Sequence, residues 1–136
     1  MGGEIDLATL WTAAGVLAGL QVTGFSFRVN REIKVAQSGD VTWFPPADIV
    51  NVVSLGITLV GVFIVPILHI GSSAVPAKAF GLSVLLLAGY PWVLAGHYDL
   101  YRRDRRSMAY FPAQEKIALS LLALAAVVYV VLALVR

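Results

Sequence analysis

The stretch Ile117–Val135, IALSLLALAAVVYVVLALV, decides the fold class, because it has no charged side chain over the length of a membrane span. A helix needs about 20 apolar residues to cross a hydrocarbon core roughly 30 Å thick. Four such stretches fill the chain, and none carries a charge near its middle; they cover about 7–27, 49–70, 76–97 and 116–135. We therefore predict an all-α fold: an integral membrane four-helix bundle of up-down antiparallel topology, forming a single domain over residues 1–136.

The composition favours a membrane protein over a soluble one. Hydrophobic residues make up 59% of the chain and charged residues 13%, whereas a soluble domain is about a quarter charged. A soluble all-α bundle, the alternative, would have too few charges to cover its surface. The lack of cysteine excludes disulfides, thiolate metal sites and thiol catalysis. Two acids and no base precede the first stretch, so we expect a retained span rather than a signal peptide.

The ten lysines and arginines are distributed unevenly between the two ends of the predicted bundle. Eight lie in or beside the first and third connections, and only Lys78 and Arg136 lie on the other side. Basic loops mark the cytoplasmic side, so we predict a multi-pass protein of the cell membrane with N- and C-termini outside the cytoplasm. Six bases form a predicted patch for anionic lipid head groups or an acidic partner: Arg28, Arg31, Arg102, Arg103, Arg105 and Arg106. The patch is too short, and too isolated, for a nucleic-acid interface.

Local signals refine the helix boundaries. Apolar residues continue at helical spacing past the first span, at Val22, Phe25, Val29, Ile33 and Ala36. This spacing predicts a helix extension whose apolar stripe either packs on a neighbouring segment or lies on anionic lipid. Asp48 is expected to be the N-cap of the second helix. Pro91 is expected to bend the third helix near Leu87–Pro91.

Small residues are the expected contacts between helices, because lipid tails are as apolar as leucine and burial alone does not drive helix association. The first span carries a stripe of small side chains at helical spacing: Ala8, Thr12, Gly15, Gly19, Thr23 and Ser26. We predict that this stripe faces the core of the bundle. The predicted packing positions are Gly15, Gly19, Gly61 and Gly89. The alternative is that these small residues are scattered without a packing role, since glycine is frequent in membrane helices.

Polar side chains within the spans gather in the predicted cytoplasmic half. The predicted intramembrane cluster comprises Gln21, Asn51, Ser54, Thr58 and Tyr90. The amide of Gln21 is costly to bury in hydrocarbon unless it is hydrogen-bonded. We therefore expect Gln21 to bond Asn51, Ser54 or Tyr90 across helices, and we favour a structural role over a polar cavity open to the cytoplasm.

The sequence contains no catalytic or cofactor-binding motif that we can identify, so we predict no cofactor and no metal site. His69 and His97 fall at opposite ends of the predicted bundle, too far apart to share a haem, and neither has a second ligand at helical spacing. Every carboxylate lies at an interface or in a connection, which argues against a proton-coupled carrier. The best enzyme candidate is the cytoplasmic rim, where His97, Asp99 and nearby arginines could act on a lipid head group.

Together these features favour a non-catalytic role, as an accessory or scaffold subunit of a membrane complex or as a homo-oligomer. The segments between the spans are too short to form a soluble domain. The last span is apolar on every side, which suits contact with lipid or with another subunit. The first alternative is an oligomeric small-solute transporter or channel that uses Gln21, Asn51 and Thr58. The second is a membrane enzyme that acts on lipid head groups.

Overall fold

The computed structural model describes residues 6–39, 44–98, 100–101 and 111–135, which form helices and the turns between them, with no strand among them. The helices are α1 (Leu7–Gln37), α2 (Pro46–Ile57), the π-helical segment η1 (Thr58–Ile64), α3 (Val65–Ile67), α4 (Val75–His97) and α5 (Ala113–Val135). Segments α2, η1 and α3 are continuous, so the described chain has four helices long and apolar enough to cross a membrane. The predicted all-α class is confirmed, and each of the four predicted stretches forms a helix long and apolar enough to cross a membrane.

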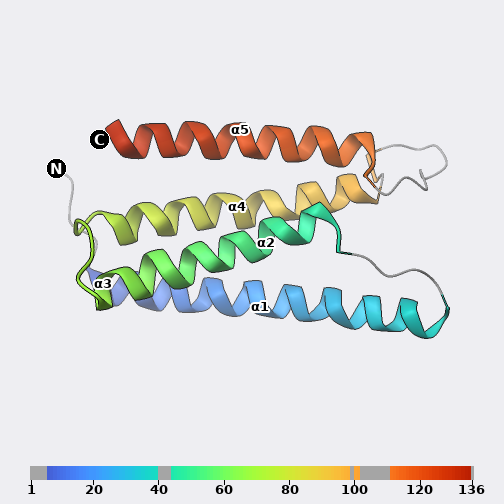
Figure 1. Cartoon of the computed structure of the whole chain (residues 1–136), viewed down its shortest axis with the longest axis horizontal. Coiled ribbons are helices and arrows are strands. Elements are labelled where there is room, and N and C mark those ends of the chain that lie inside the picture. Colours follow the sequence, from blue (N-terminus) through green and yellow to red (C-terminus); the bar gives the residue numbers. More distant parts are fainter. Residues whose placement is uncertain (1–5, 40–43, 99, 102–110, 136) are drawn as a thin grey trace.

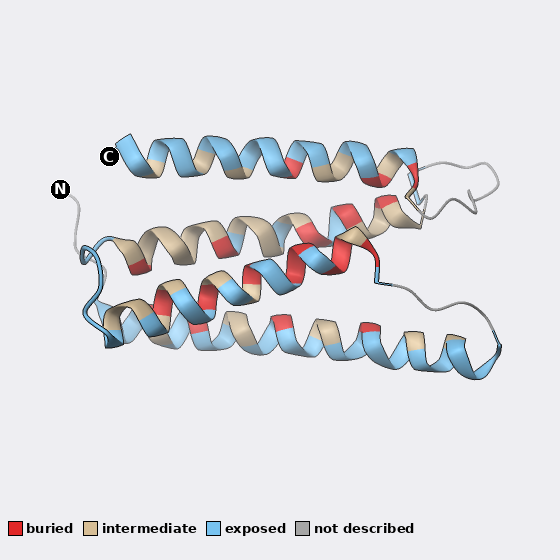
Figure 2. Cartoon of the chain, viewed as in Figure 1, coloured by how far each residue is buried: buried red, intermediate tan, exposed pale blue. Residues whose placement is uncertain are grey.

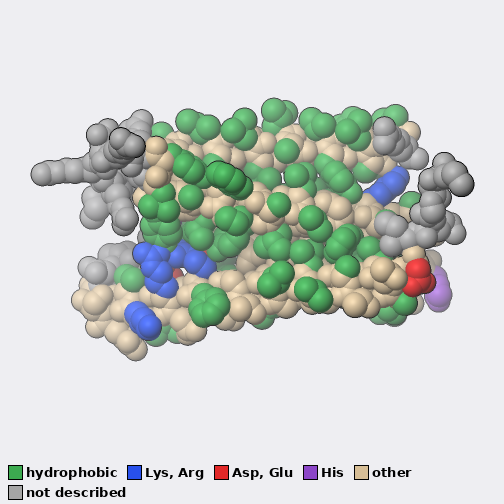
Figure 3. Space-filling view, turned by 180° about the vertical axis from the view of Figure 1, so that it is seen from behind, with side chains coloured by type: hydrophobic (Ala, Val, Ile, Leu, Met, Phe, Trp, Pro, Cys, Tyr) green, Lys and Arg blue, Asp and Glu red, His purple; other side chains and the backbone are tan. Residues whose placement is uncertain are grey.

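The four long helices run up and down in chain order (Figure 1). Helix α4 contacts α1, α2, η1 and α5, whereas α5 packs mainly against α4 and lies at one side of the bundle. Helix α1 begins and α5 ends at the same end of the molecule (Figure 1). We call the opposite end, where α1 and α4 finish and α2 and α5 begin, the basic end. On the face seen in Figure 3, hydrophobic side chains cover the middle and charged side chains lie toward the two ends.

Helix α1 continues ten residues beyond the predicted span, to Gln37, so the predicted extension is confirmed. The helix begins after Asp6, whose carboxylate accepts a hydrogen bond from the backbone N–H of Thr9 at 3.1 Å. Ser38 is its C-cap, and Gly39 follows with a φ of 84°, a conformation that suits glycine.

The prediction that Asp48 is the N-cap of α2 is wrong. The N-cap is Pro45, and Pro46 occupies the first helical turn, where its missing N–H costs nothing. Asp48 therefore lies inside the first turn, and its side chain is nearly fully buried. The carboxylate is thereby available for contacts with α1 and α4.

The π-helical segment η1 precedes a proline that explains one long-range contact. Pro66 has no N–H, so it cannot donate to the carbonyl of Val62 four residues earlier. The indole Nε1 of Trp11 donates to that carbonyl at 2.9 Å and joins α1 to η1. By contrast, Pro91 lies inside α4 and does not end that helix, which continues to His97.

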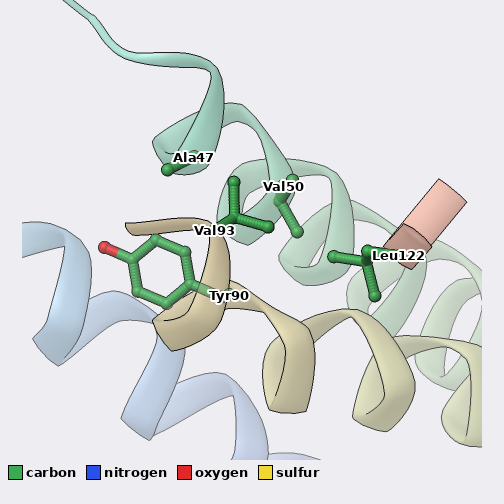
Figure 4. Packing of buried hydrophobic residues seen from close by; sticks show 5 residues of the cluster. All are labelled: Ala47, Val50, Tyr90, Val93 and Leu122. Carbon is green, nitrogen blue, oxygen red and sulfur yellow. The ribbon is translucent and has the colours of Figure 1, made fainter. Parts of the chain in front are cut away.

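The apolar core consists of two clusters. One, at the basic end, contains Ala47, Val50, Tyr90, Val93 and Leu122 from α2, α4 and α5 (Figure 4). The other joins α1 to η1 and contains Leu10, Ala14 and Val62.

Two of the predicted packing glycines lie between helices. A Cβ atom at Gly61 would overlap the side chain of Ala79, and one at Gly89 would overlap Leu122. Both positions therefore need glycine for the observed helix approach.

The small-residue stripe of α1 is on the outside, contrary to the prediction. Gly15 and Gly19 are exposed, and a Cβ atom at either would meet no other atom within 4 Å. The buried residues of α1 are Leu10, Ala14, Gln21 and Arg28 (Figure 2). At about 100° per residue, Gln21 lies on nearly the opposite face of the helix from the stripe. Since Gln21 needs polar partners, the glycine face is turned outward.

Candidate functional site

A cluster of polar side chains lies buried in the middle of the bundle, where α1, α2 and α4 meet. The Nε2 of Gln21 donates to Ser54 Oγ and lies 3.5 Å from Ser83 Oγ. Thr58 shares a hydrogen bond with the hydroxyl of Ser83, and its Oγ1 lies 3.5 Å from Gln21 Oε1. All four side chains are fully buried. They satisfy one another, so the cluster supports the structural role that was favoured for Gln21.

Asn51 joins this cluster through the backbone. Its Nδ2 donates to the carbonyl of Gln21 at 3.0 Å, while its Oδ1 is buried without a hydrogen-bond partner. Asn51 lies one helical turn after Asp48, between the mid-bundle cluster and a second group of polar side chains at the basic end. Of the three partners expected for the Gln21 amide, Ser54 is bonded to it, Asn51 bonds the backbone carbonyl of Gln21 instead, and Tyr90 belongs to the second group.

Replacing Gln21 with leucine should lower the free energy of unfolding by about 1 kcal/mol, a typical value for hydrogen bonds between membrane helices. The loss is modest because Ser54, Ser83 and Thr58 keep their bonds to each other. Unfolding of the purified protein by an ionic detergent, followed by tryptophan fluorescence, measures the change. Thr23→Val, on the exposed face of the same helix, is the control and should change stability by less than about 0.5 kcal/mol. Equal stability of the Gln21→Leu variant and the native chain would contradict the structural role.

The second group is a buried ion pair between α1 and α2. The Arg28 Nε lies 3.1 and 3.0 Å from the two carboxylate oxygens of Asp48. Tyr90 donates its hydroxyl to Asp48 Oδ1 at 3.0 Å, and Arg28 Nη1 donates to the Tyr98 hydroxyl. Arg28 is only 8% exposed and Asp48 only 2%. Three helices are thus tied together by one desolvated pair of charges and two tyrosines.

A second buried carboxylate, Glu115, joins α5 to α2 and α4. Its Oε1 accepts the backbone N–H of Ala47 at 3.1 Å, and its Oε2 lies 2.9 Å from His97 Nδ1. Helix α2 has no side-chain cap of its own, so Glu115 satisfies an N–H that the start of α2 leaves free. The side chain has no exposed surface. His97 is therefore committed to a contact between helices, which weakens the prediction that it acts on lipid head groups.

The opposite end of α5 is fastened to α4 as well. The Lys78 ammonium donates to the carbonyl of Ala133, one of the last in α5, where a cation is favourable. In return, Tyr129 donates its hydroxyl to the carbonyl of Lys78 at 2.9 Å. These contacts explain how a helix that buries little apolar surface keeps a fixed position beside α4.

A cleft of about 330 Å³ opens at the basic end between the α1 extension and the start of α2. One wall is the α1 face from Phe25 to Ala36, and the other carries Phe44 and Asp48. Phe25 of the extension's apolar stripe packs edge to face on Phe44, with centroids 5.9 Å apart. Val29, Ile33 and Ala36 stay exposed, so both interpretations of the stripe stay predictions.

The predicted basic patch is divided by the structure. Arg28 is turned inward and paired, whereas Arg31 is exposed and stacks on the Tyr98 ring at 4.5 Å. The other four patch residues, Arg102, Arg103, Arg105 and Arg106, lie outside the described residues, as does Asp99. Among the described residues, no group of three or more histidine, aspartate or glutamate side chains is placed to hold a metal ion.

Two residues of these polar groups were missed by sequence reasoning. Ser83 is a lone hydroxyl in an apolar span, and its pairing with Ser54 and Thr58 depends on how α2 and α4 are aligned. Glu115 lies in the first turn of a helix, where an acid is expected for the helix dipole alone. Its complete burial was the missing information.

No protein-family model, no curated protein and no solved structure matches this chain.

Proposed function

We propose that this chain is a non-catalytic subunit that associates laterally, within a membrane, with another membrane protein or with a second copy of itself. The observation that carries the proposal is the outward position of the small-residue face of α1. All six of its members are exposed: Ala8, Thr12, Gly15, Gly19, Thr23 and Ser26. They follow one another three or four residues apart, so together they form a shallow strip along the apolar length of the helix.

Such a strip is suited to close contact between helices in lipid. Without bulky side chains, two helix backbones can approach, and van der Waals packing then drives association where burial cannot. Gly61 and Gly89 do this inside the chain, against Ala79 and Leu122. Gly15 and Gly19 offer the same geometry with no partner among the described residues. A helix from another subunit would complete the same kind of contact.

The proposed setting is the cell membrane, with the basic end toward the cytoplasm and both termini outside. The excess of lysine and arginine in the first and third connections supports this orientation. Exposed Arg31, together with the arginines of the third connection, would then face anionic lipid head groups. Reversing the charge of these connections and mapping the termini by cysteine labelling would test the orientation.

Substituting Gly19 by valine should abolish lateral association and leave the fold intact. A Cβ atom at this position meets nothing within 4 Å outside the adjacent backbone of α1, so the substitution mainly adds bulk to the strip that a partner helix would contact. Association is measured in two ways: by energy transfer between labelled copies in lipid bilayers, and by co-purification of other proteins from native membranes. Energy transfer identifies a second copy, and co-purification identifies a different subunit.

Gly56→Val is the matched control. Gly56 is also an exposed glycine with nothing within 4 Å of a Cβ atom, but it lies on α2 among large apolar residues. We expect this variant to associate like the native chain. Unchanged association of Gly19→Val, or equal loss in both variants, would contradict a role for the α1 strip.

A further inference from the structure

The cleft at the basic end has the dimensions and walls of a small-molecule site. Its volume of about 330 Å³ falls at the lower end of the range of known ligand pockets, about 300–1,000 Å³. Val29, Ile33 and Ala36 give it an aliphatic wall, and the rings of Phe25 and Phe44 give it an aromatic one. A ligand that fits must therefore present an apolar body.

Among the described residues, the charges that line the cleft leave an excess of one negative charge. They are Arg28, Asp48 and Glu32. Arg28 and Asp48 neutralise each other, because the guanidinium contacts both carboxylate oxygens and its Nη1 bonds Tyr98. Glu32 is held only by a longer contact, 3.5 Å from Arg28 Nη2, and its side chain is 24% exposed. Its carboxylate is thus the group in the cleft that is most open to an additional partner.

The neighbouring bases of α1 do not line the cleft. Arg31 stacks on the Tyr98 ring, at 4.5 Å from its centroid. Lys34 follows Glu32 by two residues, which places it about 200° further around the helix. Neither base therefore offsets the charge of Glu32 within the cleft.

We propose that this cleft binds a small organic cation, an ammonium ion that carries an aromatic or short alkyl group. Ammonium ions are attracted to aromatic rings, Phe25 and Phe44 line the cleft, and the carboxylate of Glu32 provides the opposite charge. The apolar group lies along Val29, Ile33 and Ala36. This site is independent of the α1 strip, because the two occupy different faces of the helix, and either can exist without the other.

The test compares two probes of similar shape and opposite charge, benzyltrimethylammonium and benzylsulfonate. Isothermal titration of the full chain in a neutral detergent should detect binding of the cation and at least about tenfold weaker binding of the anion. Glu32→Gln should weaken cation binding about tenfold, the equivalent of about 1.4 kcal/mol. Asp6→Asn is the matched control, because it removes one carboxylate at the opposite end of α1 and keeps a good N-cap.

A second variant separates occupation of the cleft from general electrostatic attraction. Ala36 lines the cleft and is exposed, so Ala36→Trp should fill the site and abolish binding while the protein stays folded. The proposal is overturned if the native chain does not bind the cation, if both probes bind equally, or if Glu32→Gln and Asp6→Asn behave alike. Displacement of the probe by phosphatidylethanolamine would show that the cleft binds the ammonium group of a lipid, and it would overturn the proposal of a small free cation.

Discussion

Replacing Arg28 with methionine should lower the free energy of unfolding by about 3–5 kcal/mol, the usual cost of removing one partner from a buried ion pair. Methionine fills similar space, so the loss arises from charge rather than from a cavity. Among the described residues, Tyr90 would be the one side-chain donor left to the buried carboxylate of Asp48. Tyr98 would also lose the guanidinium that donates to its hydroxyl. Detergent-induced unfolding measures the effect.

Arg31→Met is the control for this prediction, because it removes the same charge from the same helix at an exposed position. Its cost should stay below about 1 kcal/mol, as for other surface contacts. The double variant Arg28→Met/Asp48→Leu should recover part of the lost stability, since it removes both buried charges. Failure of the second substitution to restore stability would show that the ion pair is not the origin of the effect.

The overall fold was predictable because length and charge constrain it strongly. A stretch such as Ile117–Val135 leaves few alternatives to a membrane-spanning helix, and the helical spacing from Val22 to Ala36 correctly indicated that α1 continues. The buried face of α1 was harder to predict, because Gln21 and the glycine stripe lie on opposite faces and only one of these faces can point to the core. A helix has one buried face, and the amide has a greater need for it than the glycines have.

The polar contacts of the site were only partly predictable. The bonding of Gln21 to α2 followed from the cost of an unpaired amide in an apolar setting. The pairing of Arg28 with Asp48 did not follow, because each residue also had an ordinary local role, one in a basic loop and the other at a helix start. The partner of Glu115 depends on where α5 packs, and an almost uniformly apolar helix carries no sequence signal for its orientation.

Glu115→Ala should destabilise the protein by about 3 kcal/mol or more, with the damage concentrated at the contact between α5 and the rest of the bundle. The substitution removes an acceptor from the backbone N–H of Ala47 and a partner from His97, and both groups are buried or nearly so. A buried donor that loses its acceptor, as the Ala47 N–H would, costs about 1–3 kcal/mol, and the lost contact with His97 adds to this. The Lys78 and Tyr129 contacts would still hold the far end of α5.

A graded series separates the charge of Glu115 from its hydrogen bonds. Glu115→Gln keeps an acceptor for Ala47 and fills the same volume, so it should lose less stability than Glu115→Ala. Glu32→Gln, at a partly exposed carboxylate on α1, should cost less than about 1 kcal/mol. Disulfide trapping between cysteines placed at Ala47 and Ala118 reports whether α5 has moved from α2. Equal stability of the alanine variant and the native chain would mean that the Glu115 carboxylate does not hold α5 against α2 and α4. A carboxylate that does so should be costly to remove, because its buried partners lose their contact with it.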